Sequence, residues 1–400
     1  MLYTYFTEKL LGLEEVIVKN IEQNENFTNI FIEMNLKEHC CPSCGCKTRK
    51  IHDYRTQKIK DTSAFNKNVY LFLRKRRYIC PHCGKRFYEN ISFLPRYHRM
   101  TSRLVEYIIE SLACECSFTS VAKRVNLSTS TVIRIFDCIN YGKPKLPKVL
   151  SIDEFKGNTW GEKYQCIITD PENGIVLDIL PKRYDSYLCQ YFKDMNKSDV
   201  KFFVSDMWKV YADFADVFFK GANQIVDKYH YIRQVIWAFE DVRKSEQKKF
   251  NKSHRIYFKR SKALLTKRYD FLSDEQKQQV NVMLYTSPTL SSAHYLKEKF
   301  FELLSSDNSH TAKELLFEWI EMAQESGIPK FVACAKTYTN WSKGILNSFD
   351  FSYTNGFTEG CNNKIKVLKR NAYGYRNFKR FRNRILHMFS HQKQKSSAAA

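Results

Sequence analysis

The sequence lacks long apolar runs. No window of about 18 residues is both apolar and uncharged, so we expect no membrane-spanning helix. The segment Met1–Leu13 has no basic start followed by an apolar run, which predicts that the chain carries no secretory signal. We therefore expect the protein to stay in the cytoplasm, a reducing compartment, where its 13 cysteines should not form a disulfide framework.

Acidic residues are few relative to basic ones. The 400 residues include 65 Lys+Arg and 42 Asp+Glu, which gives a formal net charge of +23. A folded chain this basic usually binds a polyanion, either nucleic acid or an acidic membrane surface, and a solvated basic surface is the alternative. The chain has no low-complexity tract, and its 43% hydrophobic residues suffice for a sizeable core, which excludes wholesale disorder.

Two pairs of cysteines predict a structural metal site. Cys41 and Cys44 form one Cys-Pro-x-Cys knuckle, and Cys80 and Cys83 form the other; each is followed by a glycine that lets the backbone turn. Four thiolates in this arrangement favour one closed tetrahedral Zn²⁺ site, whereas unligated buried cysteines explain two matched knuckles poorly. Three nearby residues break the pairing and are not predicted as zinc ligands: Cys40, Cys46 and His82.

Basic side chains crowd the two knuckles. Such a cluster would suit contacts with DNA phosphates, and a solvated basic face is the alternative. The cluster consists of Lys47, Arg49, Lys50, Arg74, Lys75, Arg76, Arg77, Lys85 and Arg86.

Residues 117–136 have the pattern of a helix-turn-helix. A helix over 117–125 precedes a turn at 126–128 and a second helix that opens with polar residues. Those polar side chains would enter the major groove of DNA, and a plain helical hairpin is the alternative. The residues expected to contact DNA are Ser128, Thr129, Ser130, Thr131 and Arg134.

Three acids are candidate metal ligands. Asp153 and Asp206 each end a strand-like apolar run, where a carboxylate is rigidly supported, and Glu359 lies in the early turns of a predicted helix. Two aspartates and a glutamate suit two Mg²⁺ or Mn²⁺ ions, although a single acid of this kind is more often a helix cap or a surface residue.

Basic and polar residues follow Glu359 at helical spacing. Asn363, Lys366 and Arg370 share its helical face. A metal-binding acid and phosphate-binding cations on one face suit a DNA strand that lies along the helix. The expected DNA contacts from this part of the chain are Asn363, Lys366, Lys369, Arg370 and Arg376.

A fourth acid follows the short apolar run 224–226. Asp227 and His230 are three residues apart at the start of a predicted helix and share one face. They would brace the acidic site or touch DNA, and an ordinary helix cap with a packed histidine is equally compatible with the spacing.

These segments together resemble the IS-L-three family of bacterial insertion-sequence transposases over nearly the whole chain. The matching motifs are SIDEFKG at 151–157, VSDMWKVYADF at 204–214, IVDKYHYIRQV at 225–235 and YTNGFTEGCNNKIKVLKRNAYGYRNFKRFRNRIL at 353–386. The resemblance implies that Asp153, Asp206 and Glu359 are the catalytic metal-binding triad, and that Asp227 and His230 are the auxiliary D-x-x-H element of several such groups.

The resemblance also implies the fold class. We expect an α/β chain whose RNase H-like catalytic core contains a large α-helical insertion, preceded by a small zinc ribbon and an α-helical helix-turn-helix domain. The expected segments are a β-rich part with the ribbon at 1–95, the helix-turn-helix at 96–142, the first part of the core at 148–235, the insertion at 236–345, and the remaining core with a basic tail at 346–392.

The implied activity is cleavage and joining of DNA. The ribbon and the helix-turn-helix would bind the terminal inverted repeats as double-stranded DNA, and the same site would serve hydrolysis and transfer to target DNA. A homodimer or larger assembly is expected, in the bacterial cytoplasm near the nucleoid. The alternatives are an RNase H-like nuclease or resolvase without strand transfer, and a non-catalytic DNA-binding regulator.

Overall fold

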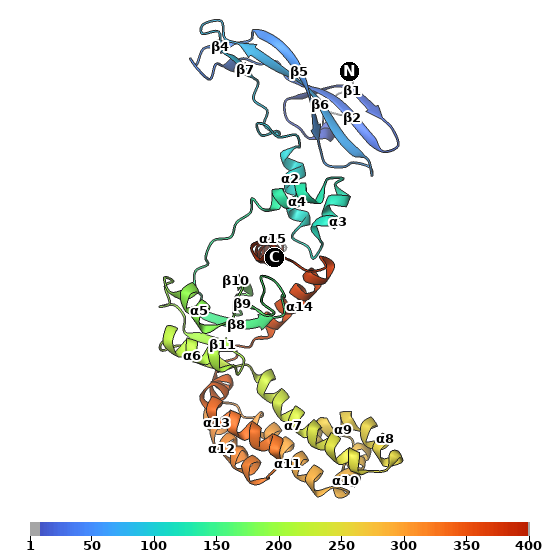
Figure 1. Ribbon diagram of the computed structural model, residues 1–400, viewed down its shortest axis with the longest axis vertical. Helices are drawn as coiled ribbons and strands as arrows, with labels where there is room; N and C mark the ends of the chain where they lie inside the picture. Colours follow the sequence, from blue (N-terminus) through green and yellow to red (C-terminus); the bar gives the residue numbers. More distant parts are fainter. Residues whose placement is uncertain (1–8, 399–400) are drawn as a thin grey trace. The chain divides into compact units, whose positions relative to one another are not determined.

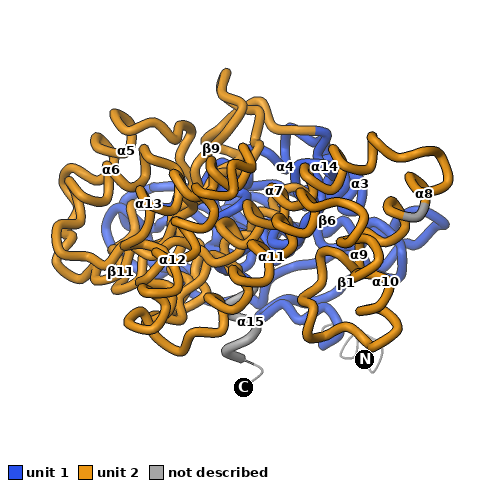
Figure 2. Tube along the Cα trace, turned by 90° about the horizontal axis from the view of Figure 1, so that it is seen from below, with its two compact units in different colours: residues 1–141, 367–373, 383–400 blue, residues 142–366, 374–382 orange. Residues whose placement is uncertain are grey.

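The computed structural model describes residues 9–398, which divide into two compact units. The first eight residues of the segment considered above for a secretory signal lie outside this range. Unit 1 contains Met1–Tyr141, Val367–Tyr373 and Asn383–Ala400, and unit 2 contains Gly142–Lys366 and Gly374–Arg382 (Figure 2). The expected C-terminal segment 346–392 is therefore divided between the units. Within 9–398, no helix is both long enough and apolar enough to cross a membrane.

Unit 1 begins with a five-stranded sheet, within the segment 1–95 that was expected to be β-rich. Its order is β1-β2-β6-β5, with β7 paired to β6; the β2–β6 pair is parallel and the others are antiparallel. Alternate side chains of β6, including Val69, Leu71 and Leu73, lie in the core of this sheet. The strands are β1 (Val16–Gln23), β2 (Phe27–Met34), β5 (Ile51–Lys60), β6 (Asn68–Ile79) and β7 (Arg86–Tyr88), with β3 (His39–Cys40) pairing β4 (Lys47–Thr48) beside them.

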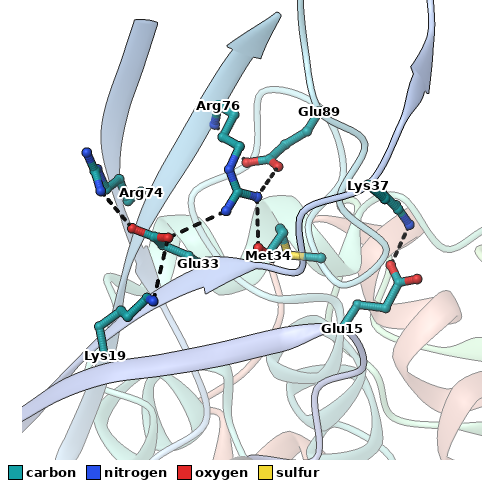
Figure 3. Close-up of polar contacts among 8 residues, drawn as sticks. All are labelled: Glu15, Lys19, Glu33, Met34, Lys37, Arg74, Arg76 and Glu89. Atoms are coloured by element: carbon teal, nitrogen blue, oxygen red, sulfur yellow. Dashed lines mark hydrogen bonds and ion pairs between the residues drawn. The ribbon is translucent and has the colours of Figure 1, made fainter. Parts of the chain in front are cut away.

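A buried arginine holds two strands of this sheet together. The Arg76 guanidinium donates to the Met34 carbonyl at 2.8 Å and pairs with Glu89 at 3.3 Å and Glu33 at 3.5 Å (Figure 3). Arg74 joins the same Glu33 carboxylate at 2.9 Å. Arg76 is 5% exposed, so this member of the predicted phosphate-binding cluster stabilises the sheet instead.

Three short helices follow, and the second and third lie where the helix-turn-helix pattern predicts them. They are α2 (Ser102–Ser111), α3 (Phe118–Arg124) and α4 (Thr129–Phe136), and each begins after a capping hydroxyl residue. The last helix, α15 (Phe378–Ala398), completes their core from the other end of the chain. Its buried Arg384 donates to the carbonyls of Cys114 and Cys116, and its His387 contacts the carbonyl of Ile109 at 2.8 Å.

Unit 2 is built on a mixed sheet of order β10-β9-β8-β11-β12 (Figure 1). The β10–β9 and β9–β8 pairs are antiparallel, and the β8–β11 and β11–β12 pairs are parallel. Residues from α6, including Tyr211 and Phe214, pack on the sheet residues Ile152 and Phe203. The elements are β8 (Val149–Phe155), β9 (Gln165–Asp170), β10 (Ile175–Leu180), α5 (Asp185–Phe192), β11 (Phe202–Ser205), α6 (Lys209–Phe218) and β12 (Asn223–Val226).

The helices between β12 and the helix that carries Glu359 form a second hydrophobic core within unit 2. Phe239, Trp319 and Tyr338 are fully buried at its centre. The helices are α7 (Lys228–Lys249), α8 (Lys252–Arg260), α9 (Lys262–Thr266), α10 (Asp274–Tyr285), α11 (Pro288–Leu303), α12 (Ser309–Glu325) and α13 (Pro329–Asp350), followed by α14 (Gly356–Asn371).

Candidate catalytic site

Three aspartates lie at one edge of the unit 2 sheet. In the parallel ladders, Val204 is level with Ser151 and Ser205 is level with Val226. Continuing both registers sets Asp206 beside Asp153 on one side and beside Asp227 on the other. The carboxyl ends of parallel strands meet at one edge of a sheet, which explains why acids distant in sequence come together.

Helix α14 brings Glu359 to this edge through hydrogen bonds at its first turn. The backbone N–H of Asn355 donates to the Asp227 carboxylate, and the Ser151 hydroxyl donates to the Asn355 side-chain oxygen. The Thr358 hydroxyl lies 2.8 Å from the Thr169 hydroxyl and 3.2 Å from that of Ser151. Because Asn355 and Thr358 are fully buried, the start of the helix is fixed to β8, β9 and β12.

Asp227 and His230 lie at the junction of β12 and α7. The Asp227 carboxylate caps α7 by accepting from the Tyr229 backbone N–H at 2.8 Å, and it also accepts from Asn355. His230 Nε2 lies 3.8 Å from Glu359 Oε1. The pair thus combines two of the predicted roles, since the aspartate is a helix cap and both residues contact the glutamate helix.

The electrostatics show that the acids share one site. Asp153 is 9% exposed, and its burial raises the pKa to about 7; the carboxylates of Asp206, Glu154 and Glu359 raise it further, against the effect of the Glu154 backbone N–H. Burial also raises the pKa of Asp206, which His230 opposes. An acid surrounded by acids is stabilised in its charged form by a cation.

Unpartnered oxygens fit a bound cation at this position. Asp206 Oδ1 and Asn362 Oδ1 are buried and have no hydrogen-bond partner in the described part of the chain. A buried carboxylate oxygen without a donor is costly unless a cation or a water binds it. Among residues 9–398, only cysteine-rich groups bring three or more ligand atoms within 4.8 Å of one another, so the acids form an open cluster and not a closed cage.

Two residues of the site, Asn362 and Arg183, were not predicted from the sequence. Asn362 donates from Nδ2 to Asp153 Oδ2 at 2.8 Å and so fixes that carboxylate. Arg183 pairs with Glu154 and lies over the Trp208 ring at 4.5 Å. Asn362 shares a helical face with Glu359, so its spacing was a usable signal, whereas Arg183 follows β10 without any pattern around it.

The four predicted zinc ligands come together in unit 1. The Sγ atoms of Cys41 and Cys83 are 3.5 Å apart, as are those of Cys44 and Cys80, and all four lie within 4.8 Å of one another. The two knuckle glycines have positive φ, Gly45 at 72° and Gly84 at 68°, which is the turn that the sequence predicts. A second group of Cys44, Cys46 and His82 is equally close, so two of the three residues left out of the prediction, Cys46 and His82, lie beside the cluster.

Most of the predicted DNA contacts lie on α4 and α14, and Arg376 lies between α14 and α15. Ser128 caps α4 by accepting from the Thr131 backbone N–H at 3.2 Å, and Arg134 is exposed further along that helix. On α14, Lys366 donates to Asn363 at 3.2 Å, and both side chains are exposed. The remaining predicted contacts are intermediate or exposed: Thr129, Ser130, Lys369, Arg370 and Arg376.

Three profiles of known protein families match the chain. A family described as transposase, of the DDE type in the ISL3 group, matches residues 150–385. The zinc-finger of the transposases IS204/IS1001/IS1096/IS1165 matches residues 37–83, and the helix-turn-helix domain of transposase family ISL3 matches residues 89–139.

Two of the three curated relatives described here have transposase names. The transposase for insertion sequence element IS1001 of Bordetella parapertussis is 27% identical over 391 residues, covering 94% of this chain and 96% of the relative. The transposase for IS1557 of Mycobacterium tuberculosis is 31% identical over 112 residues, covering 28% of this chain and 25% of the relative. A Lactococcus lactis protein named ATP-dependent protease is 32% identical over 136 residues, which are 34% of this chain and 39% of that protein.

Proposed function

Because the chain belongs to the ISL3 family of insertion-sequence transposases, we propose that it cuts and joins DNA strands at the ends of its insertion sequence. The observation that carries the proposal is the cluster of Asp153, Asp206 and Glu359 in unit 2, where burial and the neighbouring acids raise the pKa of Asp153. We infer that these three residues are the catalytic triad.

The architecture of unit 2 supports an RNase H-like core. Its strand order, β10-β9-β8-β11-β12, sets two parallel pairs beside two antiparallel pairs. Of the two triad aspartates, Asp153 lies within the last residues of β8, and Asp206 directly follows the neighbouring strand β11. The helices α7–α13 separate Asp206 from Glu359 in the sequence and have their own core, which supports the insertion-domain interpretation.

The triad would hold two divalent ions, Mg²⁺ or Mn²⁺. Bound there, such ions supply charge that activates an attacking oxygen and stabilises a leaving one. The chain's own residues orient the site: Asn362 fixes the Asp153 carboxylate, and His230 lies against Glu359. Water would first attack the phosphodiester at the element's end, and the freed 3′-OH would then attack a target phosphate in line, with no protein nucleophile.

Unit 1 would bind the DNA ends. The zinc ribbon, with one structural Zn²⁺ on its four cysteines, and the helix-turn-helix would supply a basic surface. Phosphate contacts from unit 1 would come from the predicted residues on α4 and from Lys369 and Arg370 at the end of α14, whereas Asn363, Lys366 and Arg376 belong to unit 2. Since two ends must be joined in one event, we propose that a homodimer or larger assembly forms on DNA.

The test uses the Asp206→Ala variant. Purified full-length protein with Mg²⁺ is incubated with DNA that carries the element's ends, and cleaved and joined products are separated on gels. We expect the variant to lose both products by at least about a thousandfold, because the site cannot neutralise developing charge without this ligand. Asp213→Ala, an exposed aspartate on α6, is the matched control and should retain activity.

Two results would contradict the proposal. Undiminished cleavage by Asp206→Ala would remove the triad from the reaction. Cleaved but never joined products from the unmodified chain would instead indicate a nuclease or resolvase.

A further inference from the structure

Helix α7 carries an exposed row of two aromatic rings and an arginine. Tyr229, Arg233 and Trp237 are four residues apart and therefore share one helical face. Tyr229 is 51% exposed and Trp237 is 56% exposed. The Arg233 guanidinium carbon lies 5.0 Å from the Tyr229 ring centroid and 4.5 Å from that of Trp237. We call these three residues the α7 row.

The fold does not explain this row. Neither ring belongs to the core of the helical part, which is formed by the opposite face of α7 with residues such as Val235 and Phe239. Arg233 Nε is buried without a hydrogen-bond partner, and within the described part of the chain no acid pairs with its guanidinium. A partly buried cation that lies between two rings and has no counter-charge is suited to an anionic ligand.

The row begins at the catalytic cluster. The Tyr229 ring meets the His230 ring edge-on, with centroids 5.8 Å apart, and His230 lies 3.8 Å from Glu359. From Tyr229 to Trp237 the helix rises about 12 Å, at 1.5 Å per residue. All five side chains belong to unit 2, so this continuity lies within one compact unit.

We propose that the α7 row binds unpaired nucleotides of the DNA beside the strand break. In a duplex the faces of the bases are covered by their neighbours, whereas the bases of an unpaired strand can stack on exposed aromatic rings, with cations beside the phosphates. Tyr229 and Trp237 would each stack on a base, and Arg233 would contact a phosphate or a base between them. This inference depends on the proposed function, because the unpaired strand would belong to DNA that is cleaved at the acidic site.

The experiment measures binding without catalysis. Full-length protein is titrated, in the absence of Mg²⁺ and Mn²⁺, with a blunt 20-bp duplex and with the same duplex carrying a five-nucleotide single-stranded 3′ extension. A 2-aminopurine in the extension reports stacking by fluorescence quenching. We expect Trp237→Ala to lose about tenfold in affinity for the extended duplex and to abolish the quenching, with blunt-duplex affinity changed less than twofold.

Matched variants separate stacking from charge and from folding. Tyr285→Ala, which removes a 92% exposed ring on α10, should behave as the unmodified chain does. Trp237→Phe should keep part of the quenching. Arg233→Lys should bind the extended duplex more weakly than the unmodified chain does, although it retains the positive charge. Thermal unfolding checks that Trp237→Ala is folded.

The result that would overturn the proposal is an unchanged preference for the extended duplex in both Trp237→Ala and Arg233→Ala. Failure of the proposed function is recognised separately. If Asp206→Ala cleaved DNA normally while Trp237→Ala lost quenching, the triad assignment would fall and the nucleotide-binding row would stand.

Discussion

At the scale of single residues, the acidic site contains negatively charged groups that the neighbouring residues do not neutralise. Asp153 is almost fully buried, accepts one hydrogen bond from Asn362 and lies among three other carboxylates. Asp206 keeps one buried oxygen without a partner. Sites that hold like charges together in this way are typical of function, because stability alone would favour their removal.

The raised pKa of Asp153 gives a pH-dependent prediction for protein prepared without Mg²⁺ or Mn²⁺. The folded pKa of about 7 lies above the ordinary value of 3.8, so the folded state binds the proton more tightly, and this carboxyl costs stability as the pH rises between these values. Asp153→Asn should therefore raise the free energy of unfolding by roughly 1–3 kcal/mol at pH 8 and by little at pH 4.

Urea denaturation at the two pH values measures this difference. The samples are dialysed and not treated with chelator, so that zinc bound at the proposed cysteine site would be retained. Asp213→Asn, which changes an exposed aspartate, is the control and should change stability equally at both pH values. A loss of stability in Asp153→Asn at pH 8 would mean that the buried charge is not costly.

At the scale of helices and strands, close packing positions the site. Helix α13 crosses β12 at Gly344, where an added Cβ would lie 2.8 Å from Val226 Cγ2. One turn later, Asn347 donates from its side chain to the Gln224 carbonyl at 2.7 Å. Since β12 leads directly into Asp227 and α7, this crossing links the helical core to the edge of the sheet that carries the acids.

This crossing predicts that residue 344 tolerates no large side chain. Gly344→Val should lower the free energy of unfolding by about 1–3 kcal/mol, because its extra carbons must displace β12 or Val226. Gly360→Ala, on α14, is the matched control: nothing lies within 4 Å of its added Cβ, and it should leave stability unchanged or raise it by up to about 1 kcal/mol. Equal midpoints for Gly344→Val and the unmodified chain in thermal unfolding would contradict the packing.

At the scale of the whole molecule, the candidate metal ligands are divided between two compact units. The cysteine cluster belongs to unit 1 and the acids belong to unit 2, and each unit has its own hydrophobic core. The two kinds of ligand suit different ions, since thiolates bind zinc and carboxylates bind magnesium or manganese. Loss of one metal should therefore leave the other unit folded.

Cys80→Ser tests this independence. The variant should lose its zinc, measured by elemental analysis, and with it binding of the DNA ends in a gel-shift assay, while the unfolding transition of unit 2 stays in place. Cys40→Ser is the matched control, because Cys40 is exposed, adjoins a knuckle and lies outside the four-cysteine cluster. Unfolding of the entire chain in Cys80→Ser would show that the units are not independent.

The sequence by itself determined the features that depend on residues close to one another in the chain. The Cys-Pro-x-Cys-Gly knuckles, the two helices of the helix-turn-helix pattern and the apolar runs of β8 and β11 each depend on near neighbours, so spacing and residue type were sufficient. The family motifs around Asp153, Asp206 and Glu359 added the expectation of a shared site, which the residues alone did not establish.

Only the tertiary structure decided which distant residues meet. The strand order of unit 2 sets Asp206 level with Asp153, Asn362 reaches an aspartate 209 residues away, and Arg384 of α15 completes the helix-turn-helix core 270 residues from Cys114. The role proposed for the α7 row likewise depends on the contact between His230 and Glu359. Such contacts depend on how complete surfaces pack, and no local pattern of apolar and polar residues specifies them.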